Sequence, residues 1–304
     1  MSADEHLPLT EQINSSTADL DRLGTHELLR RINDEDRRAA WAVERELEGI
    51  AATVDAIVAR IEAGGNLHYF GAGSSGRIAV LDAAEIPPTF AFPAERVVAH
   101  IAGGAAAVSA AVEAAEDDER AGESDVAAAA VSDRDAVVGL SASGRAPYVV
   151  GALRAATVRR ALTIAIVNSP ESPIAALANI AIVLLTGPEV VAGSTRMKAG
   201  SAQKMALNAM STAVMVKLGK VYGNLMVELK PTNQKLRARA ERLTATLAAT
   251  DAGRARDALA SCAYDVKTAV VMLVKKCSTD AAKTRLAAAG GRLRRALEDE
   301  AVGG

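Results

Sequence analysis

Two serine-rich turns in the first half of the chain have the residue types that bind phosphate. Residues 71–77 (GAGSSGR) follow the apolar run Leu67–Phe70, and residues 141–145 (SASGR) follow the apolar run Ala136–Leu140. Glycines let backbone amides approach an anion, a helix N-terminus favours negative charge, and serine hydroxyls donate hydrogen bonds without a metal. We therefore predict a phosphate site formed by Gly73, Ser74, Ser75, Gly76, Ser141, Ser143, Gly144 and Arg145.

The first turn also has the glycine spacing that is typical of dinucleotide-binding turns, Gly71-x-Gly73-x-x-Gly76. No Asp or Glu ends a second strand about 20 residues later, where a dinucleotide site would bind ribose. The adjacent hydroxyls of Ser74 and Ser75 suit a small phosphate better than a pyrophosphate. For each serine taken alone, capping of a helix is the alternative.

Two glutamates, Glu85 and Glu116, are candidates for proton transfer. Glu85 follows the apolar run Ile78–Ala84, for which we expect a helix that ends before Pro87-Pro88, because proline lacks the amide donor. Glu116 belongs to an acidic run for which a solvent-exposed helix face is the alternative. No His, Cys, Asp and Glu residues have metal-ligand spacing, so we expect neither a metal nor another cofactor.

Two basic residues that follow Gly193, Arg196 and Lys198, are further candidates for pairing with a phosphate or a carboxylate. A structural ion pair is an equally good explanation of each. They precede a long apolar segment, for which we predict a helix over residues 195–218.

Runs of Val, Ile and Leu alternate with helical sequence through the middle of the chain. They predict strands over residues 67–70, 96–101, 136–140, 162–167 and 180–185. This alternation is typical of an α/β fold with a parallel sheet covered by helices on both faces. Ligands bind such sheets beyond the carboxyl ends of the strands, where both serine turns fall.

Helical sequence flanks the predicted sheet. We expect two short helices over residues 15–32, with Thr25 as an N-cap, and a new helix that starts at Asn33–Asp36 and ends at Gly64-Gly65. The tail after residue 230 predicts several short helices, with caps from the segment 230–233, Asp251 and Ser278. The expected domains are a helical segment (1–64), a sheet domain (65–230) and a helical domain (231–304).

The overall charge and hydropathy exclude several classes of protein. The net charge is −2, which favours neither a nucleic-acid nor a membrane partner. No apolar run reaches the length of about 18 residues that a transmembrane helix needs. The acidic N-terminus lacks the apolar core of a signal peptide, so we expect a cytoplasmic protein.

The segment from Gly71 to Phe90, GAGSSGRIAVLDAAEIPPTF, resembles the signature of the N-acetylmuramic acid 6-phosphate etherases, a family built on the sugar isomerase (SIS) fold. Similar segments follow in the family's order along nearly the whole chain: NDED (33–36), HIAGG (100–104), VEAAEDD (112–118), SASGRAPYV (141–149), GSTRMKAGSAQK (193–204) and KVYGNLMVEL (220–229). The resemblance implies an SIS-type sheet domain and a small C-terminal bundle like a ubiquitin-associated (UBA) domain. It also implies a homodimer.

The resemblance also implies a reaction, used in the recycling or catabolism of cell-wall amino sugars. These enzymes cleave the D-lactyl ether of N-acetylmuramic acid 6-phosphate to N-acetylglucosamine 6-phosphate and D-lactate, by elimination and then hydration. By analogy, Ser75, Ser141 and Ser143 would hold the phosphate, Glu116 would be the base and Glu85 the acid. Ala146 departs from the family pattern, which usually has threonine there.

Two alternatives share the phosphate site. An SIS-type sugar-phosphate isomerase would use the proton transfer but not a leaving-group acid. A sugar-phosphate-sensing regulator would bind without turnover, and the DNA-binding kind would need a basic helix-turn-helix segment, which the sequence lacks. The presence of both glutamates in their etherase context favours catalysis.

Overall fold

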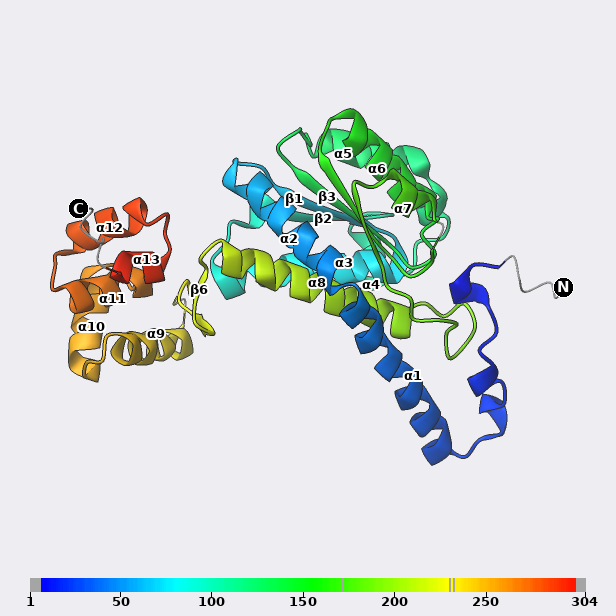
Figure 1. Ribbon diagram of the computed structural model, residues 1–304, viewed down its shortest axis with the longest axis horizontal. Helices are drawn as coiled ribbons and strands as arrows, with labels where there is room; N and C mark the ends of the chain where they lie inside the picture. Colours follow the sequence, from blue (N-terminus) through cyan, green and yellow to red (C-terminus); the bar gives the residue numbers. More distant parts are fainter. Residues whose placement is uncertain (1–6, 171, 230, 232, 299–304) are drawn as a thin grey trace. The chain divides into compact units, whose positions relative to one another are not determined.

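The computed structural model describes residues 7–170, 172–229, 231 and 233–298 (Figure 1). The chain separates into two compact units. The first contains residues up to 84 together with 94–212, and the second contains residues 85–93 together with 213–304. The division into a helical segment, a sheet domain and a helical tail stays a prediction.

The first unit is built on a five-stranded parallel sheet, which confirms the predicted fold class. The strand order is β2-β1-β3-β4-β5, and every neighbouring pair is parallel. The bounds are β1 (Leu67–Gly71), β2 (Val97–Ile101), β3 (Ala136–Ser141), β4 (Leu162–Val167) and β5 (Ile180–Val183). Each strand lies within two residues of its predicted bounds, because its Val, Ile and Leu side chains suit a buried pleated surface.

Helices cover both faces of this sheet. Helices α5 (Glu119–Ala128), α6 (Pro147–Val158) and α7 (Pro173–Leu177) lie together on one face, and α2 (Leu47–Glu62) contacts β4 and β5 from the other (Figure 1). The central strands β1, β3 and β4 are accordingly buried at every position, whereas the edge strands β2 and β5 are partly exposed. This is the burial expected of a parallel sheet in the middle of a three-layer unit.

The strand order places the two serine turns next to each other. The chain leaves β1 towards β2 on one side, while β3 pairs with β1 on the other side, with Gly71 opposite Leu140. A reversal of this kind opens a crevice between the carboxyl ends of the two strands, and ligands bind there. The turns after β1 and β3 both lead into this crevice.

The N-terminal helices differ from the prediction. Two short 3-10 turns, η3 (Ser15–Thr17) and η4 (Leu20–Arg22), confirm short helical pieces only as far as Arg22. A single helix, α1 (Thr25–Arg45), then runs straight through residues 33–36, so the helix start predicted there is wrong. Thr25 is also not the N-cap, since Gly24 occupies that position without a side-chain bond.

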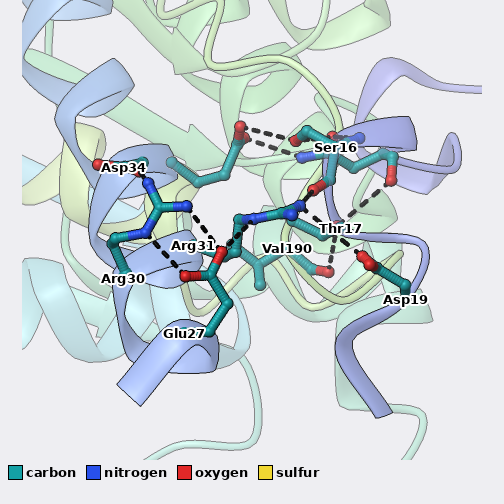
Figure 2. A network of polar contacts seen from close by, with 10 residues as sticks. Ser16, Thr17, Asp19, Glu27, Arg30, Arg31, Asp34 and Val190 are labelled. Atoms are coloured by element: carbon teal, nitrogen blue, oxygen red, sulfur yellow. Dashed lines mark hydrogen bonds and ion pairs between the residues drawn. The ribbon is translucent and has the colours of Figure 1, made fainter. Parts of the chain in front are cut away.

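Ion pairs along α1 explain why the capping residues at 33–36 do not begin a new helix. Arg30 contacts Glu27 at 2.7 Å and Asp34 at 3.2 Å, and Arg31 contacts Glu27 at 3.0 Å. These pairs are three or four residues apart, so they face each other only on a continuous helix (Figure 2). The chain breaks later, at Glu46, before α2 begins.

Helix α3 (Gly73–Phe90) also differs from the prediction, because it contains Pro87 and Pro88. Each proline removes one amide donor and disfavours the helical conformation of the residue before it. Both prolines lie in the last turn, however, and the helix ends after two more residues, at Phe90. Ala91 then adopts the left-handed conformation, with φ of 48°.

The second unit is mainly helical, as predicted. Its described residues after 218 form a small hairpin, β6 (Val221–Tyr222) and β7 (Leu225–Met226), and the helices α9 (Gln234–Leu247), α10 (Ala252–Ser261), α11 (Val266–Lys275), α12 (Thr279–Ala288) and α13 (Leu293–Leu297). The side chains of Asn233, Asp251 and Ser278 accept bonds from backbone amides at the starts of three helices, which confirms these caps. Lys230 and Thr232, from the same predicted capping segment, lie outside the described residues. The likeness to a UBA domain stays a prediction.

Candidate active site

A cavity of about 280 Å³ lies at the carboxyl ends of β1 and β3. Five of the predicted phosphate-binding residues line it, and so does the candidate base: Gly73, Ser74, Ser75, Ser141, Ser143 and Glu116. Gly76, Gly144 and Arg145 are not among its lining residues. The structure therefore brings together the hydroxyl groups of two turns that are more than sixty residues apart in the sequence.

The glycines of the first turn allow the strand and the helix to approach each other closely. A Cβ atom on Gly76 would lie 2.7 Å from the carbonyl oxygen of Gly71 and 2.6 Å from the side chain of Ile101. Gly73 has φ of 51°, a conformation that side chains disfavour, and it is the first residue of α3. The N-terminus of α3 therefore opens into the cavity, where its free amides favour an anion.

The hydroxyl of Ser75 is held from behind by a buried polar chain. It donates to Oε1 of Gln203 at 2.8 Å, and Nε2 of Gln203 donates to Oδ1 of Asn168 at 3.0 Å. Asn168 in turn donates to the carbonyl oxygen of Leu184 at 3.0 Å. Gln203 lies on α8 (Lys198–Lys217), so this helix fixes the direction of the Ser75 hydroxyl.

Hydrogen bonds within the second turn position its two serines. Oγ of Ser141 accepts from the amide of Gly144 at 3.1 Å, and Oγ of Ser143 accepts from the amide of Arg145 at 3.2 Å. The two hydroxyls are 3.4 Å apart. Each hydroxyl hydrogen can therefore still be donated to a ligand. Gly144 and Arg145 act on the site through the backbone, while the Arg145 side chain is exposed.

Ala146 also lines the cavity, at the position where the etherase pattern usually has threonine. It is the N-cap of α6 and makes no side-chain capping bond. Pro147, which follows it, is well suited to the first helical position because its missing amide would have no partner there. The chain therefore starts α6 with proline rather than with a capping hydroxyl.

Glu116 lies at the boundary between this cavity and a neighbouring one. It belongs to a 3-10 turn, η6 (Ala115–Asp117), and its side chain is exposed. The second cavity has a volume of about 340 Å³, and it shares Gly73, Ser74 and Glu116 with the first. The alternative explanation, an exposed position, is therefore correct for the solvent accessibility of Glu116. The same side chain also lines both cavities, so its exposure does not rule out a role in the site.

We call the first cavity, at the carboxyl ends of β1 and β3, the serine cavity. The other predicted residues do not line it. Glu85 is exposed and belongs to the second compact unit. Arg196 is exposed on the loop before α8. Lys198 is fully buried, and its ammonium group pairs with the carboxylate of Glu35. The geometry of Lys198 is that of a structural ion pair, the second of the two explanations that its sequence allowed.

Sequence reasoning missed the contribution of the N-terminal strap, which we define as residues 9–17. Its Glu11 lines the serine cavity together with Gly193 and Thr195 of the loop before α8. Asn14 donates to the carboxylate of Glu35 at 2.8 Å, so the strap is tied to the buried ion pair of Lys198. Glu11 and Asn14 stand out as polar residues in the segment LTEQIN (9–14), but no neighbouring residue indicates which distant side chains they contact.

The buried carboxylate of Glu35 stays ionised because of these partners. Burial opposes its charge, but the hydrogen bond and positive charge of Lys198, with donors from Asn14 and Ser16, outweigh burial and lower the pKa of Glu35. Within the described part of the chain, no group of three or more His, Cys, Asp or Glu residues is arranged to hold a metal ion. None of the helices described is long and apolar enough to span a membrane.

Comparisons with known proteins agree with this geometry. Residues 49–157 match the model of the glucokinase regulatory protein N-terminal SIS domain. Among solved structures, a phosphoheptose isomerase from Francisella tularensis superposes with a TM-score of 0.50 at 17% identity. The match covers 64% of this chain and 100% of that one, and it supports the SIS fold alone.

Curated relatives match over nearly the whole chain. The N-acetylmuramic acid 6-phosphate etherase of Deinococcus radiodurans is 47% identical over 295 residues, which cover 97% of each chain. That of Salmonella dublin is 50% identical over 292 residues, which cover 95% of this chain and 98% of the relative. The similarity therefore includes both compact units.

Proposed function

The chain belongs to the N-acetylmuramic acid 6-phosphate etherase family, and we propose that its serine cavity is where the substrate phosphate binds and the ether is cleaved. The enzyme is a carbon–oxygen lyase that acts on N-acetylmuramic acid 6-phosphate. The observation that carries the assignment of the site is the cavity itself, which combines two serine turns, a helix N-terminus and Glu116 at the β1–β3 crevice. The isomerase and regulator alternatives are set aside, because the full-length relatives are etherases.

Phosphate recognition in this proposal needs only groups of the protein. The hydroxyls of Ser141 and Ser143 and the first amides of α3, that of Ser75 included, would donate to the phosphate oxygens. Gln203 would keep Ser75 in place through its 2.8 Å hydrogen bond. Gly76, Gly144 and Arg145 would support the turns, and Arg196 stays a candidate for the lactyl carboxylate.

The proposed chemistry begins with the open-chain sugar, whose C1 aldehyde acidifies the proton on C2. Glu116 takes this proton, and the electron pair forms a C2=C3 double bond as the C3–oxygen bond of the lactyl ether breaks. Glu85 gives a proton to the departing lactyl oxygen. Water then adds at C3 and a proton returns to C2, which yields N-acetylglucosamine 6-phosphate and D-lactate.

Isotope labelling tests this sequence of steps. Turnover in D₂O should place deuterium at C2 of the product sugar, and turnover in H₂¹⁸O should label the C3 hydroxyl while D-lactate keeps the ether oxygen. Mass spectrometry of both products measures the label. Label in lactate, or no deuterium at C2, would rule out elimination followed by hydration.

A matched pair of variants tests the role of Glu116. Glu116→Gln should lower the rate of lactate release by roughly 10²–10⁴-fold, the usual value of a general base. Glu113→Gln is the control, since Glu113 belongs to the same acidic run but lines only the second cavity. Near wild-type release from Glu116→Gln, or equal losses in the two variants, would contradict the assignment.

We also propose that the enzyme is a homodimer, as SIS domains commonly are. The segment 193–204, which contributes Gly193 and Thr195 to the cavity, is our candidate for a loop near the partner. Light scattering of active enzyme at the mass of a single chain would exclude the dimer. The cytoplasmic location stays a prediction from the sequence.

A further inference from the structure

The serine cavity contains a carboxylate that the proposed chemistry does not use. Glu11 is exposed at the wall of the cavity, and no lysine or arginine lines this cavity. Among the residues that the structure describes, its carboxylate has neither a hydrogen bond nor an ion pair. An ionised carboxylate can only accept hydrogen bonds. A fully ionised phosphate ester offers it no donor and adds a like charge, so Glu11 does not belong to the phosphate-binding part of the cavity.

The position of Glu11 is built into the first unit. The carbonyl oxygen of Thr10 accepts from the amide of Gly193 at 3.1 Å, and the hydroxyl of Thr17 donates to the carbonyl oxygen of Val190 at 2.9 Å. Nδ2 of Asn14 donates to the carbonyl oxygen of Pro188 at 3.2 Å. Three bonds thus join the strap to the loop before α8, one from the residue before Glu11 and two from residues after it.

The strap is also attached to α1. Arg31 donates to the carbonyl oxygen of Ser16 and lies 3.7 Å from the carboxylate of Asp19, while its other side contacts Glu27 (Figure 2). Figure 2 also shows Thr17 reaching Val190 on the loop. The strap is therefore held between a helix and a loop, both of which are parts of the same compact unit.

The loop leaves room for the carboxylate itself. Gly193 has φ of 76°, and a Cβ atom on it would lie 2.8 Å from Oε2 of Glu11. A side chain at position 193 would displace the carboxylate as well as strain the backbone. Gly193 therefore contributes to the position of Glu11 in two ways: it leaves space for the carboxylate, and its amide bonds the carbonyl oxygen of Thr10.

We propose that Glu11 is a substrate-binding residue that sets the direction of the sugar phosphate in the cavity. Its charge keeps the phosphate at the serine turns, and its oxygens accept hydrogen bonds from sugar hydroxyls at the other end. This inference rests on the proposed function of the cavity, and it adds a specificity determinant for polyol phosphates over free phosphate. Glu11 has no part in the proton transfers.

Calorimetry with two probes tests the proposal without any turnover. Inorganic phosphate has no sugar hydroxyls, whereas glucitol 6-phosphate has the phosphate and an open polyol chain. In Glu11→Gln, inorganic phosphate should bind roughly threefold to tenfold more tightly, because a like charge is lost. The preference for glucitol 6-phosphate over phosphate should fall by about tenfold, because charge-assisted hydrogen bonds are lost.

Thr17→Val is the matched control. It removes the bond to Val190 and loosens the strap, but it leaves the carboxylate in place. Both probes should then weaken together and their ratio should stay the same, as expected of a structural effect. Unchanged or weaker phosphate binding in Glu11→Gln, or an unchanged ratio, would overturn the proposal.

Failure of this inference can be separated from failure of the proposed function. Lactate release by the wild-type enzyme tests the function, and the ratio of the two dissociation constants tests Glu11. If Glu11→Gln is too unstable to purify, Glu11→Asp provides the second variant. It keeps the charge on a shorter side chain, so it should keep weak phosphate binding while losing part of the preference for the polyol.

Discussion

The two compact units each contain a lysine–glutamate pair with a buried lysine, but the pairs are organised in opposite ways. In the first unit the acid is the centre, since Glu35 accepts from Lys198, Asn14 and Ser16. In the second unit the base is the centre. Lys267 donates to Glu228 and to two carbonyl oxygens, those of Gly219 at 2.9 Å and Gly291 at 2.7 Å.

The partners of each pair explain what it does. Asn14 and Ser16 come from the strap that carries Glu11 to the serine cavity, so the acid-centred pair is connected to the site. The carbonyl groups around Lys267 lie just after α8 and α12, where the free carbonyls of helix ends attract a cation. The same ionic chemistry therefore supports the site in one unit and only joins chain segments in the other.

The largest effect should come from Lys198→Met. Without the ammonium group, the carboxylate of Glu35 stays buried and loses its main counter-charge, which typically costs about 3–5 kcal/mol of stability. Because the strap loses its anchor, KM for the sugar phosphate should also rise. Chemical denaturation and steady-state kinetics measure the two effects.

Lys204→Met is the control for this prediction. Lys204 lies on the same helix, but it is exposed, and its interactions are a hydrogen bond to the side chain of Asn208 and a charge interaction with Asp82. It should therefore change stability by less than about 0.5 kcal/mol. A Lys198→Met enzyme with wild-type KM would show that the acid-centred pair does not reach the site.

A smaller effect is expected from Lys267→Met, of about 2–3 kcal/mol. Glu228 is less buried than Glu35, and it keeps Lys220 at 2.6 Å, whereas the remaining basic partner of Glu35 is the exposed Arg38 at 3.2 Å. Hydrogen exchange should show faster opening of α11 and α12 while the strands of the first unit keep their protection, and KM should be unchanged. Lys283→Met, an exposed lysine on α12, is the control. Loss of protection in the sheet would contradict the separation of the two units.

The histidines of the first unit should make it lose stability in acid in a way that the second unit does not. In the first unit, burial and the neighbouring charge of His68 lower the pKa of His100 to about 4, and burial lowers that of His68 as well. Between pH 6.5 and 4 the unfolded chain therefore binds protons that the folded chain does not, so stability falls as the pH falls. The second unit contains no histidine and lacks this contribution.

Hydrogen exchange at several pH values between 7 and 4 checks this prediction for each unit. The variant His100→Gln should lessen the loss in the first unit, whereas His26→Gln, which changes an exposed histidine on α1, should not. Equal acid sensitivity of the sheet and of the helical unit would argue against the histidine pair as the cause. The rings support the pairing, since Nδ1 of His68 lies 3.3 Å from Nε2 of His100.

Much of the fold could be predicted because its signals are local. The strands follow from apolar runs between glycines, and the helix caps at Asp251 and Ser278 follow from residues that bond the amide three positions ahead. The serine turns follow from residue type and from their place after a strand. The two helix boundaries that were predicted wrongly also have local explanations. Helix α1 continues through the capping residues at 33–36 because its ion pairs support it, and α3 continues through two prolines in its last turn.

The sequence by itself determined the strands of this protein, the edge of the sheet that carries the serine turns and, through its resemblance, the reaction. Only the tertiary structure placed Glu11 in the cavity, gave Ser75 its partner Gln203 and showed Lys198 to be buried. Ser75 and Gln203 are 128 positions apart in the sequence, and Lys198 and Glu35 are 163 positions apart. Backbone preferences and periodicity act over a few residues, so no local pattern encodes which distant side chains will meet.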